Sequence, residues 1–134
     1  MTTEPMDETL SDLLDLSQQL LDCIIAADWE TYERLCDPTI SAFEPEARGQ
    51  LVEGMDFHRY YFDLGGSDKP KQATIASPHV RLLGDSVAIV SYVRLVQSID
   101  GDGNPQTSRC DETRVWERQE DGWRHVHFHR SINP

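Results

Sequence analysis

The C-terminal half of the chain is dominated by long runs in which apolar and polar residues alternate. Alternation puts every second side chain on the same face of a β-strand. The dipeptide Asp121-Gly122 between the last two runs is typical of a two-residue hairpin turn. The pattern predicts a meander of four long antiparallel strands. They cover residues 72–83, 87–99, 106–119 and 123–132.

The first half of the chain shows helical spacing instead. Leucine and isoleucine recur at helical intervals from Asp7 to Ala27, which predicts a long amphipathic helix. A short helix capped by Asp28 and a third helix over 55–64 follow. Helices followed by a meander indicate an α+β fold. Our hypothesis is a curved antiparallel sheet that wraps the long helix and leaves a pocket at its open end. Brief strands are predicted at 39–43 and 51–53, and loops at 45–49, 65–70 and 100–105.

Length, charge and cysteine content limit the class of protein. The chain of 134 residues has a one-domain length, with a loose tail over 1–6 and a single domain over 7–134. Its formal charge of −12 argues against nucleic acid and anionic membranes as partners. The three cysteines have no metal-type spacing, and no leader or membrane-spanning run is present. We therefore expect a cytoplasmic protein.

Three arginines share strand faces with apolar residues. Alternation groups Arg94 with Val90, Tyr92 and Val96. It places Arg114 beside Trp116, and Arg130 beside Val126 and Phe128. Removing an unpaired ion from water costs several kcal/mol, so such arginines need carboxylate partners or a bound anion. Two interpretations stay open: internal salt bridges, or a bound anion held by planar guanidinium groups. The candidate internal partners are Asp111, Glu112 and Glu117.

Histidines offer further candidates. His58 lies on the apolar side of its predicted helix, where it is either a core residue, a donor to a ligand or a general acid/base. His125, His127 and His129 alternate on one strand face, as metal ligands can. No spaced cysteine or carboxylate accompanies them, so we predict no metal and no cofactor, and a packing or interface role for that face.

Four long motifs stand out in the sequence: CDPTISAFEPEA (36–47), LVEGMDFHR (51–59), ETRVW (112–116) and VHFHRS (126–131). Together with the segments around Pro78, Gly84 and Arg94, they resemble one known family, the association (hub) domain of calcium/calmodulin-dependent protein kinase II. The likeness covers about residues 15–134.

The resemblance implies a nuclear-transport-factor-2-like cone, a fold shared with SnoaL-like proteins, and homo-oligomerisation as a ring of stacked dimers. It also implies a pocket for small carboxylates, whose three arginines and one histidine fall here on Arg94, Arg114, Arg130 and His58. The kinase and calmodulin-binding segments of that family have no counterpart in this sequence. We therefore expect a stand-alone relative with no kinase activity and no calmodulin binding. The loop 65–70 is shorter than in the kinase and lacks its tryptophan, and His125 has no counterpart in the family motif.

Two classes of function follow. The first is an oligomerisation module whose pocket binds a small carboxylate through the three arginines, with His58 and Tyr92 orienting the ligand. The alternative is an enzyme like SnoaL proteins or ketosteroid isomerases, acting on a small acidic or keto substrate with His58 as acid/base. No obvious Asp or Glu for the pocket appears in the sequence, which favours binding. A scaffold with the acidic first helix as its docking surface is the third interpretation.

Overall fold

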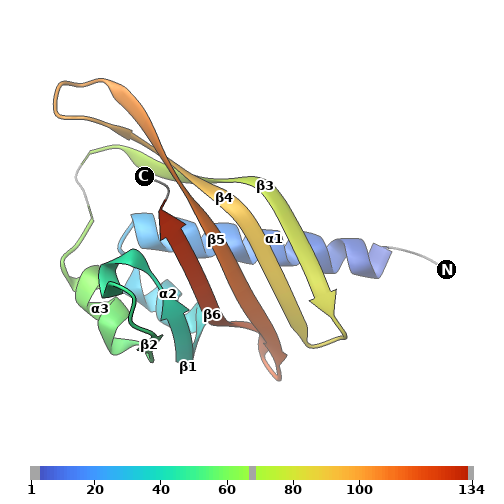
Figure 1. Cartoon of the computed structure of the whole chain (residues 1–134). Coiled ribbons are helices and arrows are strands. Elements are labelled where there is room, and N and C mark those ends of the chain that lie inside the picture. Colours follow the sequence, from blue (N-terminus) through green and yellow to red (C-terminus); the bar gives the residue numbers. More distant parts are fainter. Residues whose placement is uncertain (1–3, 67–68, 133–134) are drawn as a thin grey trace.

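A long helix and a six-stranded sheet form the body of the molecule. The structure, a computed structural model, describes residues 4–66 and 69–132. Helix α1 (Glu4–Ile25) lies across one face of a sheet with strand order β2-β1-β6-β5-β4-β3 (Figure 1). The predicted curved α+β architecture is therefore confirmed. The strands are β1 (Cys36–Phe43), β2 (Val52–Glu53), β3 (Lys71–Leu83), β4 (Val87–Ile99), β5 (Pro105–Gln119) and β6 (Gly122–Ile132).

Helix α1 is held by its apolar stripe. Leu13, Leu20 and Leu21 are buried, with at most 1% of each residue exposed, and α1 packs mainly on β3. The acidic residues between them face solvent, as expected for an amphipathic helix. The helix begins at Glu4, three residues before the predicted start at Asp7. Among the described residues, no helix has both the length and the apolar character needed to cross a bilayer.

The four-stranded meander follows the predicted alternation. In β4, Ala88, Val90 and Tyr92 are buried on the face toward α1, while their neighbours are half-buried on the other face. The last hairpin turn lies at Glu120-Asp121, one residue earlier than predicted. Gly122 follows with a φ of 121°, a conformation that favours glycine.

Strand β6 contains an irregularity that changes which side chains share a face. Trp116 lies opposite His125 and Val115 lies opposite His127, so Val126 has no partner on β5. This extra residue is a β-bulge. It turns His125 onto the buried face, while Phe128 stays on the face with Trp116. The prediction that His125, His127 and His129 share one face is therefore wrong.

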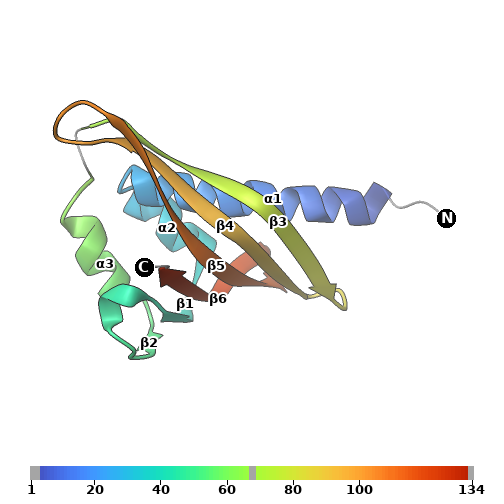
Figure 2. The same cartoon turned by 45° about the horizontal axis from the view of Figure 1, so that its top comes forward.

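The remaining short elements gather at one end of the sheet (Figure 2). Helix α2 (Trp29–Leu35) is capped by Asp28 as predicted, and helix α3 spans Asp56–Asp63. Strand β1 runs parallel to β6, which brings the segment after β1 against the end of β6. The predicted loop over 45–49 contains a short 3-10 helix, η1 (Pro45–Ala47). In the predicted loop 65–70, residues 67 and 68 lie outside the described residues.

Candidate functional site

A small pocket opens at this end of the sheet. Its volume is about 170 Å³, enough for a small organic molecule. The wall is aromatic, and the polar groups come from β5, β6, α3 and the segment around η1. The pocket thus has the usual composition of a ligand site, an apolar wall with a few polar groups. The wall includes Tyr32, Tyr61, Phe62 and Phe128, and the polar groups are Glu44, Glu46, His58, Arg114 and Arg130.

The inner end of the pocket is a buried ion cluster around Arg114. Only 1% of its side chain is exposed, and its Nη2 lies 3.1 Å from Glu112 Oε1. Arg114 Nε donates to Tyr92 Oη at 2.8 Å, and Tyr92 Oη donates to Glu112 Oε1 at 2.5 Å. Arg94 Nη1 lies 3.3 Å from Glu112 Oε2, an ion pair without hydrogen-bond geometry. Phe128 covers the guanidinium group of Arg114 at 4.6 Å.

Glu112 neutralises this cluster. Burial alone would raise the pKa of its carboxyl, but Arg114 and Arg94 outweigh burial and hold that pKa below its usual value. The carboxylate in turn raises the pKa of Arg114 against the opposing effect of burial. Of the two interpretations that the sequence left open, internal pairing therefore applies to Arg114 and Arg94. The partner is Glu112, while Asp111 and Glu117 are exposed.

His125 completes the inner cluster. It is fully buried, with Nε2 3.3 Å from Arg114 Nη1 and Nδ1 3.5 Å from Cys36 Sγ. Because arginine can only donate, Nε2 accepts and Nδ1 carries the proton. Burial and then Arg114 lower the pKa of His125 well below its usual value, so it is neutral. Sequence reasoning missed this role, since only the bulge at Val126 turns His125 inward.

The outer end of the pocket is a second ion cluster around Arg130. Its Nη2 donates to both carboxylate oxygens of Glu46 and lies 4.0 Å from Glu44 Oε2. Arg130 has 13% of its side chain exposed, whereas Glu46, on η1, has 36% exposed. Both glutamates reach Arg130 because β1 pairs with β6. A cation at the mouth of the pocket is thus held by a solvent-accessible carboxylate.

Glu44 and His58 form a buried polar pair beside this cluster. His58 Nδ1 lies 3.7 Å from Glu44 Oε1. Burial, opposed by Arg130, raises the pKa of Glu44 to about 7. Burial and the charge of Arg114 lower the pKa of His58 to about 4. At neutral pH His58 is therefore uncharged and the contact is not a full ion pair. His58 Nε2 is buried and has no hydrogen-bond partner among residues 4–66 and 69–132.

The predicted site residues are only partly brought together. His58, Arg114 and Arg130 line the pocket, and Tyr92 lies behind Arg114. Arg94 lines a neighbouring hollow together with Arg130, and it is linked to the inner cluster of the pocket through its ion pair with Glu112. The expectation that the pocket lacks a carboxylate is wrong, because Glu44 and Glu46 line it. Glu112 and Arg114 are two residues apart on β5 and therefore share a face, so sequence alternation could have identified Glu112 as the partner of Arg114.

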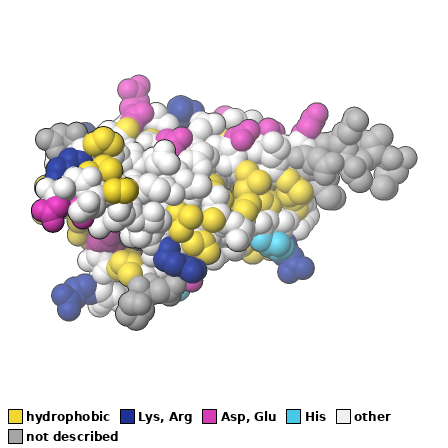
Figure 3. Space-filling view, turned by 90° about the horizontal axis from the view of Figure 1, so that it is seen from above, with side chains coloured by type: hydrophobic (Ala, Val, Ile, Leu, Met, Phe, Trp, Pro, Cys, Tyr) yellow, Lys and Arg dark blue, Asp and Glu magenta, His cyan; other side chains and the backbone are white. Residues whose placement is uncertain are grey.

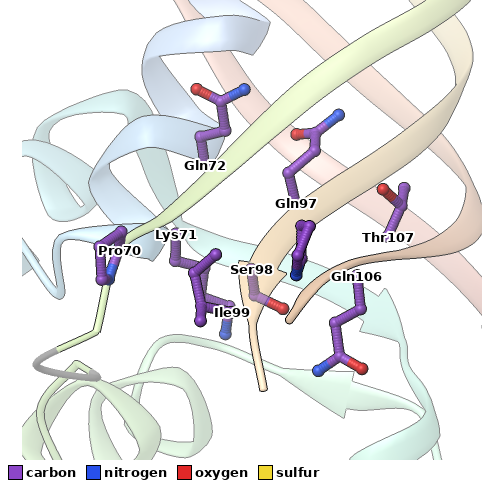
Figure 4. Close-up of a pocket in the computed structure, with 9 residues that line it drawn as sticks. Pro70, Lys71, Gln72, Gln97, Ser98, Ile99, Gln106 and Thr107 are labelled. Atoms are coloured by element: carbon purple, nitrogen blue, oxygen red, sulfur yellow. The ribbon is translucent and has the colours of Figure 1, made fainter. Parts of the chain in front are cut away.

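A larger hollow lies elsewhere, beside Pro70, where β3 begins, β4 ends and β5 begins. It measures about 570 Å³, but its polar side chains are mostly amides and hydroxyls (Figure 4). Figure 4 shows these side chains projecting in different directions from neighbouring strands. Lys71 is the charged residue among those that line it. Converging charge and buried titratable groups make the small pocket the better candidate site. In the described part of the chain, no group of three or more possible metal ligands is present.

Comparison with known proteins agrees with the fold and with the motifs. The profile of the calcium/calmodulin-dependent protein kinase II association domain matches residues 9–134. The rabbit (Oryctolagus cuniculus) calcium/calmodulin-dependent protein kinase type II subunit delta is 45% identical over 99% of this chain. The chain spans 27% of the length of that curated relative.

Solved structures extend the comparison. The hub homology domain of this kinase from Chlamydomonas reinhardtii is 47% identical, with a TM-score of 0.89 over 94% of this chain and 99% of that one. A nuclear transport factor 2-like superfamily protein from Salmonella enterica is 20% identical, with a TM-score of 0.76 over 96% and 94% of the two chains. The latter shows the fold alone, and it confirms the predicted nuclear-transport-factor-2-like architecture. The chain belongs to the calcium/calmodulin-dependent protein kinase II association domain family.

Proposed function

We propose that this domain assembles with copies of itself and binds a small carboxylate in the pocket at Arg130. The observation that carries the binding half is the pairing of Arg130 with both oxygens of a solvent-accessible carboxylate. A guanidinium group that holds one carboxylate at a pocket mouth is suited to hold another. His58 Nε2, buried and unpartnered in the described part of the chain, supplies a polar contact for the ligand.

The outer face of the sheet supports self-assembly. Figures 1 and 2 show α1 on one face and, among the described residues, no helix over the other. That open face carries half-buried Val87, Ile89, Val93 and Leu95 on alternate positions of β4, and Val115 on β5. Figure 3, which views the molecule from above and not onto this face, shows further hydrophobic side chains at the surface in separate patches. Apolar surface of this kind marks interfaces, and the family is named for association.

The test combines a thermal-shift titration with light scattering. Acetate and malonate are titrated into wild type, Arg130→Ala and the control Arg81→Ala, whose exposed arginine lies on β3. We expect saturable stabilisation of wild type and of the control, lost in Arg130→Ala. We expect a scattering mass of at least two copies of the 15.3 kDa chain. A monomeric mass would refute assembly, and equal shifts in all three proteins would refute binding at Arg130.

A second candidate function is proton transfer, favoured by the pKa of about 7 at Glu44. A carboxyl with that pKa, buried beside an aromatic wall, is suited to act as a general base near neutral pH. His58, with its pKa lowered to about 4, is the weaker base of the pair. These two pKa values favour Glu44 over His58 as the base of the enzyme alternative. The test measures how fast the α-protons of a small keto acid are replaced by deuterium in heavy water in the presence of the protein. We expect wild type to accelerate this exchange and Glu44→Gln to lose the acceleration.

A further inference from the structure

The carboxylate of Glu46 occupies the position at which a ligand would meet Arg130. Arg130 Nη2 donates to both oxygens of this one carboxylate. The second carboxylate nearby, Glu44, is 4.0 Å away and has only 8% of its side chain exposed. Arg130 is itself largely buried, and its Nε has no partner among the described residues. The contact with Glu46 is therefore the main neutralising contact of a cation whose other face lines the pocket.

We infer that Glu46 occupies the anion-binding position at Arg130 when no ligand is present. A ligand carboxylate displaces Glu46 from Arg130, and the Glu46 side chain rotates toward solvent. The inference rests on the proposed carboxylate binding and adds its mechanism of entry. Binding at this site is then an exchange of one carboxylate for another, with no net change in the charge beside Arg130. Only molecules in which Glu46 has left Arg130 can bind the ligand. The apparent Kd for any carboxylate therefore equals the intrinsic Kd divided by the fraction of such molecules.

Glu46 can move away from its arginine more easily than the buried carboxylate Glu112 can. It lies on η1, a three-residue 3-10 helix in a segment whose residues 48–51 are all exposed. Local backbone hydrogen bonds, such as Arg48 N to Pro45 O at 3.1 Å, close this turn. Segments with exposed, local hydrogen bonds open at low free-energy cost. Glu112, by contrast, is buried and held between two arginines on a central strand.

Simple addition of a ligand beside Glu46 is disfavoured by charge. Arg130 would then face three carboxyl groups: Glu44, Glu46 and the ligand. The pKa of Glu44 is already raised by burial and, to a lesser extent, by Glu46, although Arg130 opposes the shift. A further anion would force protonation of Glu44 or cost like-charge repulsion. Exchange avoids both, since one carboxylate leaves as another arrives.

The test measures acetate binding by isothermal titration calorimetry at fixed ionic strength. Glu46→Gln removes the competing charge, and Glu46→Asp keeps the charge but shortens its reach. Glu53→Gln, an exposed glutamate on the neighbouring β2, is the matched control for the loss of one negative charge. Arg130 is largely buried, but the Glu46 side of the ion pair is open to water, which weakens the pair. We therefore expect Kd to fall about two- to fivefold in both Glu46 variants and to stay unchanged in the control. Adding Arg130→Ala to Glu46→Gln is expected to abolish binding.

The outcomes separate this inference from the function on which it rests. If wild type binds acetate and the Glu46 variants bind with the same Kd, the exchange is refuted while carboxylate binding stands. If Glu53→Gln tightens binding as much as Glu46→Gln, the effect is general electrostatics and the exchange is again refuted. If no variant binds acetate, the proposed carboxylate function itself fails. Melting temperatures of all variants verify that each protein is folded.

Discussion

The arginines at the two ends of the pocket differ in the burial and the sequence position of their carboxylate partners. Arg114 is matched by Glu112, two residues away on the same strand, and both side chains are almost fully buried. Arg130 is matched by Glu46, which lies 84 residues away in sequence on a short exposed turn. The inner pair is enclosed by Tyr92 and His125. The outer pair is reached by solvent.

This difference separates structural charge from exchangeable charge. A buried ion pair is costly to break, because each partner is left unpaired in a medium that solvates it poorly. An exposed pair is worth little, because water replaces the lost partner. The inner cluster therefore fixes the shape of the pocket, and only the outer cluster is available for exchange with a ligand.

The largest effect is expected from breaking the inner pair. Glu112→Gln leaves Arg114 and Arg94 without a buried counter-charge, so we expect a loss of about 3–5 kcal/mol in the free energy of unfolding. Urea denaturation at one fixed protein concentration measures it. Glu117→Gln, an exposed position on the same strand, is the matched control and should change stability by less than about 0.5 kcal/mol. Similar values for the two variants would contradict the distinction.

An intermediate effect is expected from the pair between the clusters, Glu44 and His58. The folded-state pKa of Glu44 is about 7 against a usual 4.5, so its contribution to stability is complete below pH 4.5 and lost as pH rises through 7. The folded-state pKa of His58 is about 4 against 6.5, so its contribution is complete above pH 6.5 and lost as pH falls through 4. At about 1.4 kcal/mol for each pH unit, each is worth about 3 kcal/mol.

These opposite signs can be measured separately. Relative to wild type, Glu44→Gln should gain stability as pH rises from 4.5 to 7, and His58→Asn should gain stability as pH falls from 6.5 to 4. Wild type alone should vary less across this window, because the two contributions offset each other. Denaturation of the three proteins at a series of pH values is the measurement. Parallel profiles for all three would show that neither group titrates with a displaced pKa.

The smallest effect is expected from breaking the outer pair. Glu46→Gln removes the main partner of Arg130, but solvent and Glu44 remain close. We therefore expect a loss of less than about 1 kcal/mol in the free energy of unfolding, measured in the same urea series as Glu112→Gln. A loss as large as that of Glu112→Gln would make Arg130 a structural residue like Arg114 and would remove the contrast between the two clusters.

Sequence alternation predicted the inner cluster better than the outer one. Arg114 and Tyr92 were placed on the buried face because β4 and β5 keep regular register along this stretch. Alternation also places Glu112 on this face, but the sequence alone does not distinguish a buried ion pair from a surface ion pair between residues two apart. His125 could not be assigned, because one extra residue in β6 reverses the parity beyond it.

The outer cluster depends on a contact that no local pattern reveals. Glu44 and Glu46 meet Arg130 only because β1 lies parallel to β6. A parallel pair joins segments that are distant in the sequence, so periodicity within either segment says nothing about it. The family resemblance supplied the fold and the positions of the arginines, but not the carboxylates that hold them.

The parallel pairing of β1 with β6 also has a consequence for folding. Contacts such as Cys36 with His125 join residues 89 apart in the sequence, and their formation requires closure of the long intervening stretch of chain. Pairings of this kind form slowly compared with local hairpins and helices. The hairpins of β3–β6 can form early, but the mouth of the pocket exists only after the two distant strands dock. Any ligand of this pocket therefore acts on the completed domain and cannot guide its folding.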